Sequence, residues 1–529
     1  MKQKLTLQAL DTLLQNRFKE GFLSLKDLPN PSTFKDMDKA TERIVSAIQN
    51  KEKITIIGDY DVDGVTSTTL MKLFFEEIDY PIEWIIPNRF KDGYGLSANI
   101  IPRILGTDLA ITVDNGISAV YAAKLCKEEG IELIITDHHL LAPEVPECFA
   151  IIDQKQEECT FPYEDVCGAQ IAWYLIASLK NALAIKINMM SYMELTAIAI
   201  IADMMPLQHI NRAMVEAGIQ ALNKSTRPAI RAFLEHSQKE ALNAEDIGFF
   251  LAPLLNAAGR MEDASFAVEF LASTNIYDAR VRLERLIDFN TLRKATEQEL
   301  TQKALAQVNV SDAVIVVEGE DWHEGVVGIV AARVARHHEK PCIVLSNNGE
   351  GTLKGSGRSF GDCDLFSITN RCREHLEKFG GHQAAIGLSM KKEALEAFKI
   401  QIQKNYATGN YVQNVEDPDI VGALDFANIS FDLTKAVKKY EPYGQGNPSP
   451  KFISYDVEIL QADTMGKEGE HLRFSFAQEG IVMAGVQFKT REVYDIGSKC
   501  SVVYTVNENH FRGKVTLQLM VEKIVTGNI

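Results

Sequence analysis

The chain has 529 residues, too many for one hydrophobic core, and about 150 residues per domain predicts three or four domains. Hydrophobic residues make up 46% and charged residues 24%, which is typical of globular proteins and argues against a disordered chain. The 55 basic and 72 acidic residues give a net charge of −17. This charge excludes a broadly basic duplex-binding protein but permits an enzyme with a narrow basic groove.

The sequence predicts a reduced, monomeric protein of the cytoplasm. Residues 1–17 lack the apolar core of a signal peptide, because Lys4, Gln8 and Asp11 interrupt the leucines. No stretch approaches the roughly 18 uncharged apolar residues of a membrane helix, so we expect no membrane association. The eight cysteines include no C-x-x-C pair, and free thiols are expected.

Strand and helix patterns alternate from Lys53 onward. Apolar strand-like runs cover residues 54–58, 82–87, 109–113, 131–136 and 149–153, with helices predicted over 65–78 and 117–130. Continuous apolar strands joined by helices predict a doubly wound parallel sheet, and therefore an α/β fold.

The middle of the chain predicts a mostly helical region, residues 167–305, and then a second α/β unit. A long helix, with breaks allowed, is expected from Ser265 or beyond to Val308. The second unit begins with a strand at 313–317. It continues through a helix at 326–338, a strand at 341–346 and a helix that ends at KFGGH (378–382).

The last eighty or so residues predict a small β-barrel. Strand-like segments begin near Phe452, His471, Ile481, Cys500 and Lys514, with NENHFRGK (507–514) as a hairpin turn. An OB-fold is the leading candidate, and its aromatic and basic residues are candidates for contacts to single strands, although none is assigned individually. These candidates are Tyr455, Arg473, Phe474, Phe511, Arg512 and Lys514.

The expected organisation has six parts. They are an N-terminal segment of unexplained role (1–48), a catalytic domain (49–264), a connecting helix (265–308), a second α/β domain (309–405), a linker (406–450) and the barrel (451–529). Glycine, asparagine and proline in YGQGNPSP (443–450) mark the last boundary.

Acidic residues follow three of the predicted strands. GDYDVDG (58–64) carries Asp59, Asp61 and Asp63, VDNG carries Asp114, and Asp137-His138-His139 follows the strand at 131–136. An EF-hand loop is disfavoured for GDYDVDG because its twelfth position is Leu70 instead of a glutamate and a strand precedes it. A solvated turn is the remaining alternative for this segment, and a helix or turn cap is the alternative for each aspartate taken alone.

The shared position of these residues predicts a metal site. The carboxyl ends of parallel strands meet at one edge of a sheet, where ligands of open α/β sheets bind. Carboxylates crowded there repel one another and need a cation, and oxygen ligands with an imidazole suit Mn²⁺ or Mg²⁺. Two such ions with a hydrolytic role are the natural interpretation. Asp203, after the apolar run AIAIIA, is a fourth element, with a surface helix cap as its alternative.

These motifs, in this order, resemble the DHH phosphoesterase superfamily. LLNAAGRM (254–261), DWHEGVVGIVAARV (321–334), GSGRS (355–359) and GGHQAAIG (380–387) are similar to the RecJ branch and its DHH-associated domain. The resemblance runs from about Ile54 to the end of the chain. It implies a DHH-type parallel sheet, a helical connection, a DHH-associated domain and a C-terminal OB-fold-like barrel.

The resemblance implies a set of metal ligands: Asp61, Asp63, Asp114, His138 and Asp203. His139 is expected to face the scissile phosphate or to support the ligand shell, and Asp59 is an additional acidic residue. Some relatives carry a histidine at the position of Ile57, so one metal is expected to have fewer protein ligands and to bind more weakly.

The resemblance also implies phosphate contacts. Arg89 is expected to meet the strand, Arg260 the scissile region, and Ser356 with Arg358 the 5′-terminal phosphate, since guanidinium groups suit bidentate phosphate binding. His382 in GGH is expected to contact substrate. The alternatives are ordinary surface arginines and a helix C-cap followed by a solvent-facing histidine.

The expected function is a single-stranded-DNA-specific 5′→3′ exonuclease with two metal ions, acting in DNA repair and recombination. A helicase and a single-stranded-DNA-binding protein are the partners that the resemblance implies. The closest alternative is a DHH phosphodiesterase for short oligonucleotides or cyclic dinucleotides. An inorganic pyrophosphatase and a catalytically dead scaffold are further alternatives.

Overall fold

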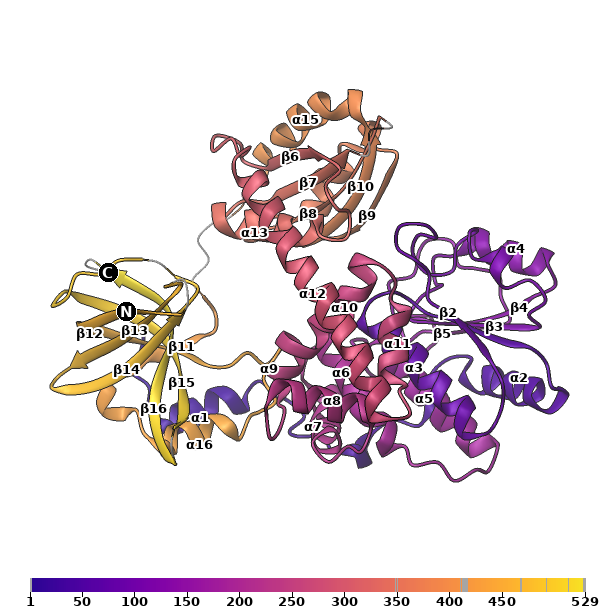
Figure 1. Ribbon diagram of the computed structural model, residues 1–529, viewed down its shortest axis with the longest axis horizontal. Helices are drawn as coiled ribbons and strands as arrows, with labels where there is room; N and C mark the ends of the chain where they lie inside the picture. Colours follow the sequence, from indigo (N-terminus) through magenta and orange to yellow (C-terminus); the bar gives the residue numbers. More distant parts are fainter. Residues whose placement is uncertain are drawn as a thin grey trace. The chain divides into compact units, whose positions relative to one another are not determined.

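The computed structural model describes residues 2–347, 349, 351–409, 411, 417–466, 469–490, 492–511 and 513–526 (Figure 1). The chain forms two compact units. The first comprises residues 1–28, 204–216 and 416–529, and the second comprises residues 29–203 and 217–415. In the described part of the chain, no helix has both the length and the apolar character of a membrane span.

The second unit contains the predicted parallel sheet. Its strands run in the order β2-β1-β3-β4-β5, and every pairing is parallel, which confirms the doubly wound α/β fold. The strands are β1 (Ile54–Ile57), β2 (Glu83–Ile85), β3 (Leu109–Val113), β4 (Glu132–Thr136) and β5 (Ala150–Ile152). The central strands β1 and β3 are wholly buried, because helices cover both faces.

Helices cover both faces of this sheet, and the register of its strands places their ends together. One face packs against α4 (Val120–Glu128), and the other is covered by α2 (Met37–Asn50), α3 (Val62–Glu77) and α5 (Gly168–Ala182) (Figure 1). The register pairs Ile57 with Thr112 and Val113 with Thr136. The ends of β1, β3 and β4 therefore lie side by side at one edge.

The helical region continues the same unit. Its helices include α6 (Met190–Ala202), α8 (Pro228–Ser237), α9 (Ala244–Asp246), the π-helix η4 (Ile247–Leu251), α10 (Ala252–Met261), α11 (Ser265–Leu271) and α12 (Ile276–Leu305), while α7 (His209–Leu222) spans the division between the units. The long helix expected from Ser265 or beyond is α12, and a break separates it from α11. The break arises because the Asn275 side chain accepts a hydrogen bond from the Asp278 backbone and caps a new helix.

A second sheet, in the order β6-β7-β8-β10-β9, follows α12. It comprises β6 (Ile315–Glu320), β7 (Cys342–Asn347), β8 (Thr352–Arg358), β9 (Lys378–His382) and β10 (Ala385–Lys391). β6 and β7 are parallel and the other pairs are antiparallel. Its two faces pack against α13 (Val327–His338) and α15 (Leu395–Ala407).

One prediction for this sheet is wrong. KFGGH does not end a helix: it forms the edge strand β9, in which Gly380 pairs with Gly387 of β10. The helical segment ends earlier, with α14 (Leu365–Asn370) and a short 3₁₀ turn at Arg373–His375. Two consecutive glycines are poor helix formers, and pairing with β10 decides their conformation.

The first unit is built on a closed five-stranded barrel. Its strands β12 (Lys451–Met465), β13 (His471–Gln478), β14 (Ile481–Phe488), β16 (Lys514–Thr526) and β15 (Lys499–Phe511) pair in that order, and β12 pairs with β15 to close it. The predicted barrel is confirmed. The described part of NENHFRGK is mostly strand, because β15 continues to Phe511 and β16 begins at Lys514.

The segments before the barrel belong to its core. α1 (Leu7–Gln15) buries Leu10 and Leu14 in the cluster that also holds Tyr440 and barrel residues. The range 406–450, predicted as a linker, contains β11 (Ile420–Ala423), parallel to β12, and α16 (Phe431–Lys438). YGQGNPSP, expected to mark a boundary, instead forms a turn within this unit, where the backbones of Gly444 and Asn447 pair.

Candidate metal centre and strand-binding groove

Seven residues gather at the carboxyl edge of the parallel sheet. Asp59, Asp61 and Asp63 follow β1, Asp114 follows β3, His138 and His139 follow β4, and Asp203 ends α6. They form three overlapping groups whose ligand atoms lie within 4.8 Å of one another in each group. The groups are Asp59-Asp61-Asp114, Asp63-His138-Asp203 and Asp114-His138-His139. The structure therefore brings all the sequence-predicted metal-site residues together.

Local hydrogen bonds hold the first aspartates in place. Asp61 is the N-cap of α3, and its Oδ1 accepts from the backbone amides of Asp63 and Gly64 at 3.0 and 3.1 Å. Asp63 accepts from the amides of Gly168 and Ala169, at the start of α5, at 2.6 and 2.8 Å. Backbone amides at two helix N-termini thus stabilise carboxylates on this edge.

Asp114 occupies a conformation that non-glycine residues rarely adopt. Its φ is +64°, in the left-handed region, and its amide donates to Thr136 O at 3.0 Å. A Cβ on Gly168 would lie 2.5 Å from Asp114 Cβ, so only glycine fits beside this carboxylate. Backbone strain of this kind is commonly found at functional sites.

His138 lies at the centre of the carboxylates. Its Nε2 is 3.1 Å from Asp114 Oδ1 and 3.7 Å from both Asp63 Oδ2 and Asp203 Oδ2. Burial and the nearby His139 lower the pKa of His138 to about 3, so the imidazole is neutral. A neutral imidazole is the form that binds a metal.

The carboxylates are electrostatically unfavourable as a group. Burial and mutual repulsion raise the pKa of Asp63 to about 6 and that of Asp203 to about 8. The same causes raise the pKa values of Asp59 and Asp114 well above the ordinary value. Among the described residues, neither Asp59 Oδ1 nor Asp203 Oδ2, both buried, has a hydrogen-bond partner. These oxygens and a neutral nitrogen fit divalent cations with a preference for hard ligands.

Two details refine the expected ligand set. Ile57 is fully buried in β1 within an apolar cluster, so this position supplies no ligand. His139 Nδ1 lies 2.7 Å from Asp137 Oδ1, which also accepts the amides of His138 and His139. Burial opposes charge on His139, but Asp137 and the other carboxylates outweigh it and raise its pKa to about 9.

A groove of about 1180 Å³ opens beside this centre. Residues that follow the strands of the parallel sheet line one side, and residues of α13, β8, β9 and β10 line the other. Arg89, Arg260 and Arg358 face it, and in the described part of the chain none of the three forms an ion pair with a carboxylate. Burial and its arginine neighbours lower the pKa of Arg260 to about 10. Such unpaired guanidinium groups are suited to binding phosphates.

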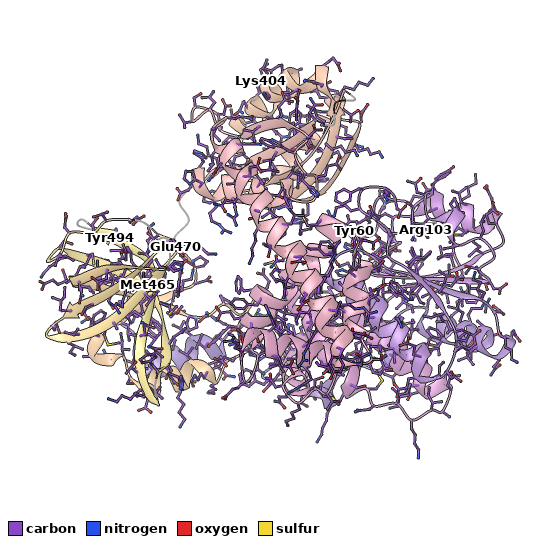
Figure 2. The ribbon with its side chains drawn as sticks, in the orientation of Figure 1. Tyr60, Arg103, Lys404, Met465, Glu470 and Tyr494 are labelled. Carbon is purple, nitrogen blue, oxygen red and sulfur yellow. The ribbon has the colours of Figure 1, made fainter. Side chains whose placement is uncertain are left out.

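The arginines are held by uncharged groups. Arg89 stacks on the Tyr60 ring at 3.9 Å, and Tyr60, labelled in Figure 2, lies in the loop after β1. Arg260 Nη1 donates to Gly325 O at 3.2 Å. Arg358 Nη1 donates to Ser356 Oγ at 2.8 Å, beside Gly328 near the start of α13. None of these three contacts is with a carboxylate.

The structure places His382 outside the described lining of the groove, and the six barrel candidates differ in exposure and contacts. Gly380 and Gly381 line the groove, whereas His382 is exposed on β9 and is not among the described lining residues. Phe474 is buried barrel core, whereas Phe511 is exposed and Arg473 pairs with Asp463 at 3.2 Å. Tyr455 accepts the Lys2 amide, Lys514 is exposed, and Arg512 lies outside the described residues.

Sequence reasoning missed Tyr94, which lines the groove between the arginines and the histidines. Its hydroxyl lies 3.3 Å from His139 Nε2. The available signal was the motif DGYG, in which Gly93 and Gly95 both take positive φ and so fix a turn around the tyrosine.

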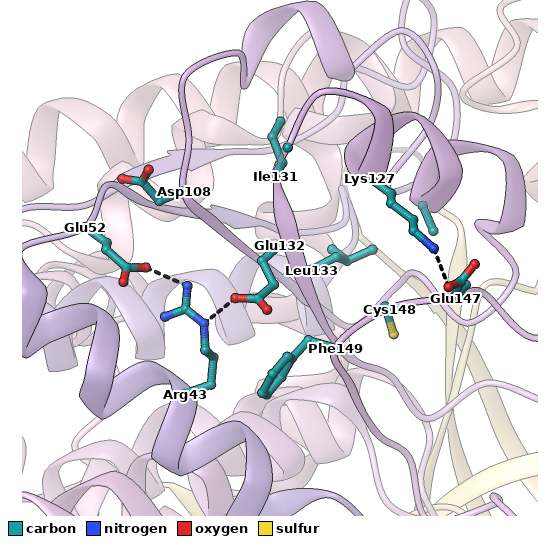
Figure 3. Close-up of a pocket in the computed structure, with 12 residues that line it drawn as sticks. Arg43, Glu52, Asp108, Lys127, Ile131, Glu132, Leu133, Glu147, Cys148 and Phe149 are labelled. Carbon is teal, nitrogen blue, oxygen red and sulfur yellow. Dashed lines mark hydrogen bonds and ion pairs between the residues drawn. The ribbon is translucent and has the colours of Figure 1, made fainter.

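A second cavity, of about 610 Å³, lies at the opposite edge of the parallel sheet, near the amino end of β4 (Figure 3). Arg43 bridges Glu52 and Glu132 there, and Lys127 pairs with Glu147. These charges compensate one another within the protein. Both cations among the described residues that line this cavity are therefore paired, unlike the arginines of the groove beside the metal centre.

Three family models match the chain. They are the DHH family N-terminal domain over residues 53–200, the DHHA1 domain over residues 311–407 and the RecJ OB domain over residues 420–523. The RecJ structure from Thermus thermophilus in complex with Mn²⁺ superposes with a TM-score of 0.80 at 25% identity, covering 94% of this chain and 72% of that chain.

Curated relatives match nearly the whole chain. The single-stranded-DNA-specific exonuclease RecJ of Haemophilus influenzae is 31% identical over 539 residues, covering 96% of this chain and 93% of the relative. The protein of the same name from Bacillus subtilis is 33% identical, covering 95% of this chain, which spans only 65% of that relative's length. The chain therefore belongs to the RecJ family of DHH proteins.

Proposed function

We propose that this protein is a metal-dependent exonuclease specific for single-stranded DNA that degrades strands from the 5′ end in DNA repair and recombination. The observation that carries the proposal is a groove with three unpaired arginines that opens beside a buried cluster of carboxylates and a neutral histidine. Membership in a family whose curated members are named single-stranded-DNA-specific exonucleases supports the same substrate.

Asp61, Asp63, Asp114, His138 and Asp203 would hold two divalent cations, with Asp59 as an additional acidic residue. Mn²⁺ and Mg²⁺ both suit the oxygen-rich donor set, and a family member was solved with Mn²⁺. When bound, the ions supply acidification of an attacking water and neutralisation of charge on the phosphate. The chain's own contribution is to fix the ligands by helix N-termini and by the constrained turn at Asp114.

The groove would bind the strand through its phosphates. Arg89 follows β2 of the parallel sheet, Arg260 of α10 donates to the Gly325 carbonyl oxygen before α13, and Ser356 and Arg358 lie on β8; all four line the groove. Arg358 and Ser356 sit beside the N-terminal turn of α13, whose backbone amides also favour an anion. A terminal 5′-phosphate held there would set the 5′→3′ direction, with His382 near the same glycine-rich edge.

The test uses the purified full chain with Mn²⁺, Mg²⁺ or a chelator. Its substrates are a single-stranded DNA labelled at the 3′ end, the same sequence as a blunt duplex, and a dinucleotide. We expect metal-dependent shortening of the long single strand from its 5′ end and no attack on the duplex. Cleavage confined to the dinucleotide would assign the protein to the short-substrate phosphodiesterases instead.

A matched pair of variants assigns the activity to the metal centre. Asp114→Ala removes a central carboxylate and should abolish turnover, whereas Glu42→Ala removes an exposed carboxylate from α2 and should leave it unchanged. Equal turnover in wild type and Asp114→Ala would contradict the assignment of the site.

We further propose that the enzyme works in the cytoplasm as a monomer, beside a helicase and a single-stranded-DNA-binding protein. All eight cysteines are free in the structure, which suits a reducing compartment. An enzyme confined to single strands needs another activity to unwind duplex ends. Adding a helicase and ATP to the duplex assay should therefore make the duplex a substrate.

A further inference from the structure

Both ring nitrogens of His139 have partners in the structure. Nδ1 lies 2.7 Å from Asp137 Oδ1, and Nε2 lies 3.3 Å from the hydroxyl of Tyr94. The Tyr94 ring also meets the His139 ring edge to face, with centroids 6.0 Å apart. His139 differs in this respect from His138, whose Nε2 is surrounded by carboxylates.

Asp137 fixes the Nδ1 side of the His139 imidazole. Its Oδ1 accepts from the amides of His138 and His139 at 2.8 and 3.1 Å, and its Oδ2 accepts from the Ile117 amide at 2.8 Å. The carboxylate is also almost completely buried. Several short donors of this kind fix both its ionised state and its orientation.

Tyr94 is equally well fixed on the other side. It lies between Gly93 and Gly95, and a Cβ on Gly95 would lie 2.8 Å from the Asn115 side chain. Asn115 in turn accepts the Leu96 amide at 2.9 Å and donates to the carbonyl oxygens of Ile57 and Val113, at the ends of β1 and β3.

The loop that carries Tyr94 is thus bonded to the same strand ends that carry the metal-site residues. The Tyr94 ring also packs edge to face against Tyr60, with centroids 5.9 Å apart. Tyr94 is about half exposed, and its exposed part faces the groove.

We propose that Tyr94 is a positioning residue for His139: its hydroxyl and Asp137 hold the imidazole from opposite nitrogens, so that the ring stays at the mouth of the groove. This inference rests on the proposed exonuclease function. Of the two roles expected for His139, facing the scissile phosphate or supporting the ligand shell, it favours the first. With both nitrogens engaged, His139 is not a metal ligand, and its ring stays beside the metal centre where it lines the groove.

The test compares Tyr94→Phe with wild type. Phenylalanine keeps the ring packing against Tyr60 and His139 and removes only the hydroxyl. Loss of one hydrogen bond that orients an acting group should lower kcat about 5- to 10-fold and leave KM for single-stranded DNA unchanged. Tyr121→Phe, which removes the hydroxyl of an exposed tyrosine on α4, is the matched control and should change neither constant.

A double-mutant cycle separates positioning from a general structural role. In a His139→Ala background, Tyr94→Phe should cause no further loss, because the group it positions is gone. The same loss in both backgrounds would overturn the proposal, as would a Tyr94→Phe enzyme with wild-type kcat. The rise in Tm caused by Mn²⁺ should persist in His139→Ala. Its disappearance would make His139 a metal ligand and also overturn the proposal.

A spectroscopic measurement is independent of turnover. In ¹⁵N-histidine spectra of the Mg²⁺-bound protein, assigned with His139→Ala, Tyr94→Phe should move the Nε2 signal of His139 and leave its Nδ1 signal in place. An Nε2 signal that stays in place in Tyr94→Phe would refute the contact between the Tyr94 hydroxyl and His139. If wild type were inert on every strand tested, the proposed function would fail, and this spectrum would still decide whether Tyr94 positions His139.

Discussion

Gly168→Ala adds one methyl group to the wall of the metal centre and alters none of the proposed ligands. A Cβ at this position would lie 2.5 Å from Asp114 Cβ and 2.6 Å from Asp114 Oδ1. Non-bonded carbons pack best at about 3.5–4.0 Å, so one of the two groups must move by about 1 Å. The start of α5 is held by the bonds from Gly168 and Ala169 to Asp63 and by the buried face of the helix. We therefore expect Asp114 to be displaced.

The expected effect on metal binding and turnover is large compared with the effect on folding. Overpacking of a buried site costs about 1–3 kcal/mol. A displacement of about 1 Å at a reacting centre lowers the rate about 100-fold. An ion present at about 100 times its Kd stabilises a protein by about 2.7 kcal/mol, and a 100-fold weaker Kd removes most of that.

The assay measures thermal unfolding with and without Mn²⁺, together with the rate of single-strand degradation. Gly168→Ala should lose most of the Mn²⁺-dependent rise in Tm while its metal-free Tm falls only modestly. Gly248→Ala is the matched control, because its Cβ would meet Ile201 at an ordinary 3.4 Å. Wild-type Mn²⁺ binding and rate in Gly168→Ala would refute the geometry described for Asp114.

Three further predictions follow from the charges. The raised pKa values of Asp63 (about 6) and Asp203 (about 8) mean that these two carboxyl groups keep protons in the folded metal-free protein that they lose in the unfolded chain, so their contribution to stability should fall as pH rises from about 4 to about 8. The lowered pKa of His138 acts in the opposite direction below about pH 6.5. Thermal unfolding in chelator checks this, and a fall of equal size in Asp203→Asn would contradict the contribution of Asp203. Arg358→Ala should weaken binding of 5′-phosphorylated strands more than that of 5′-hydroxyl strands, measured by fluorescence anisotropy in chelator, and equal losses would argue against a 5′-phosphate site. Glu297→Ala should cost about 2 kcal/mol of unfolding free energy, because the buried Glu297 holds one arginine on α12 and another on α13. Denaturant titration measures this loss, with Glu299→Ala as the control, because Glu299 forms only an exposed ion pair worth less than about 1 kcal/mol. Equal losses of unfolding free energy in the two variants would contradict the role of Glu297.

The sequence alone determined the parallel sheet and most of the metal centre. Strand runs at 54–58, 109–113 and 131–136 are local patterns, and parallel strands end at one edge. The residues that directly follow those runs could therefore be placed together from the order of the strands. The five barrel strands were predictable for the same reason, since alternation and turn residues are local signals.

Tertiary structure decided what depends on partners distant in the chain. KFGGH is a strand only because β10 lies beside it, and α1 is part of the barrel unit only because its leucines are buried there. Residues 417–450 resemble a linker in sequence because their packing partners lie elsewhere in the chain.

In the metal centre too, contacts between residues distant in the chain were decided by the tertiary structure. Asp203 comes within 3.7 Å of His138 from the end of a helix, and Tyr94 reaches His139 through a turn bonded to Asn115. Periodicity and motif spacing describe a segment's own conformation. They do not describe which distant side chain will lie against it, because that depends on the packing of the whole unit.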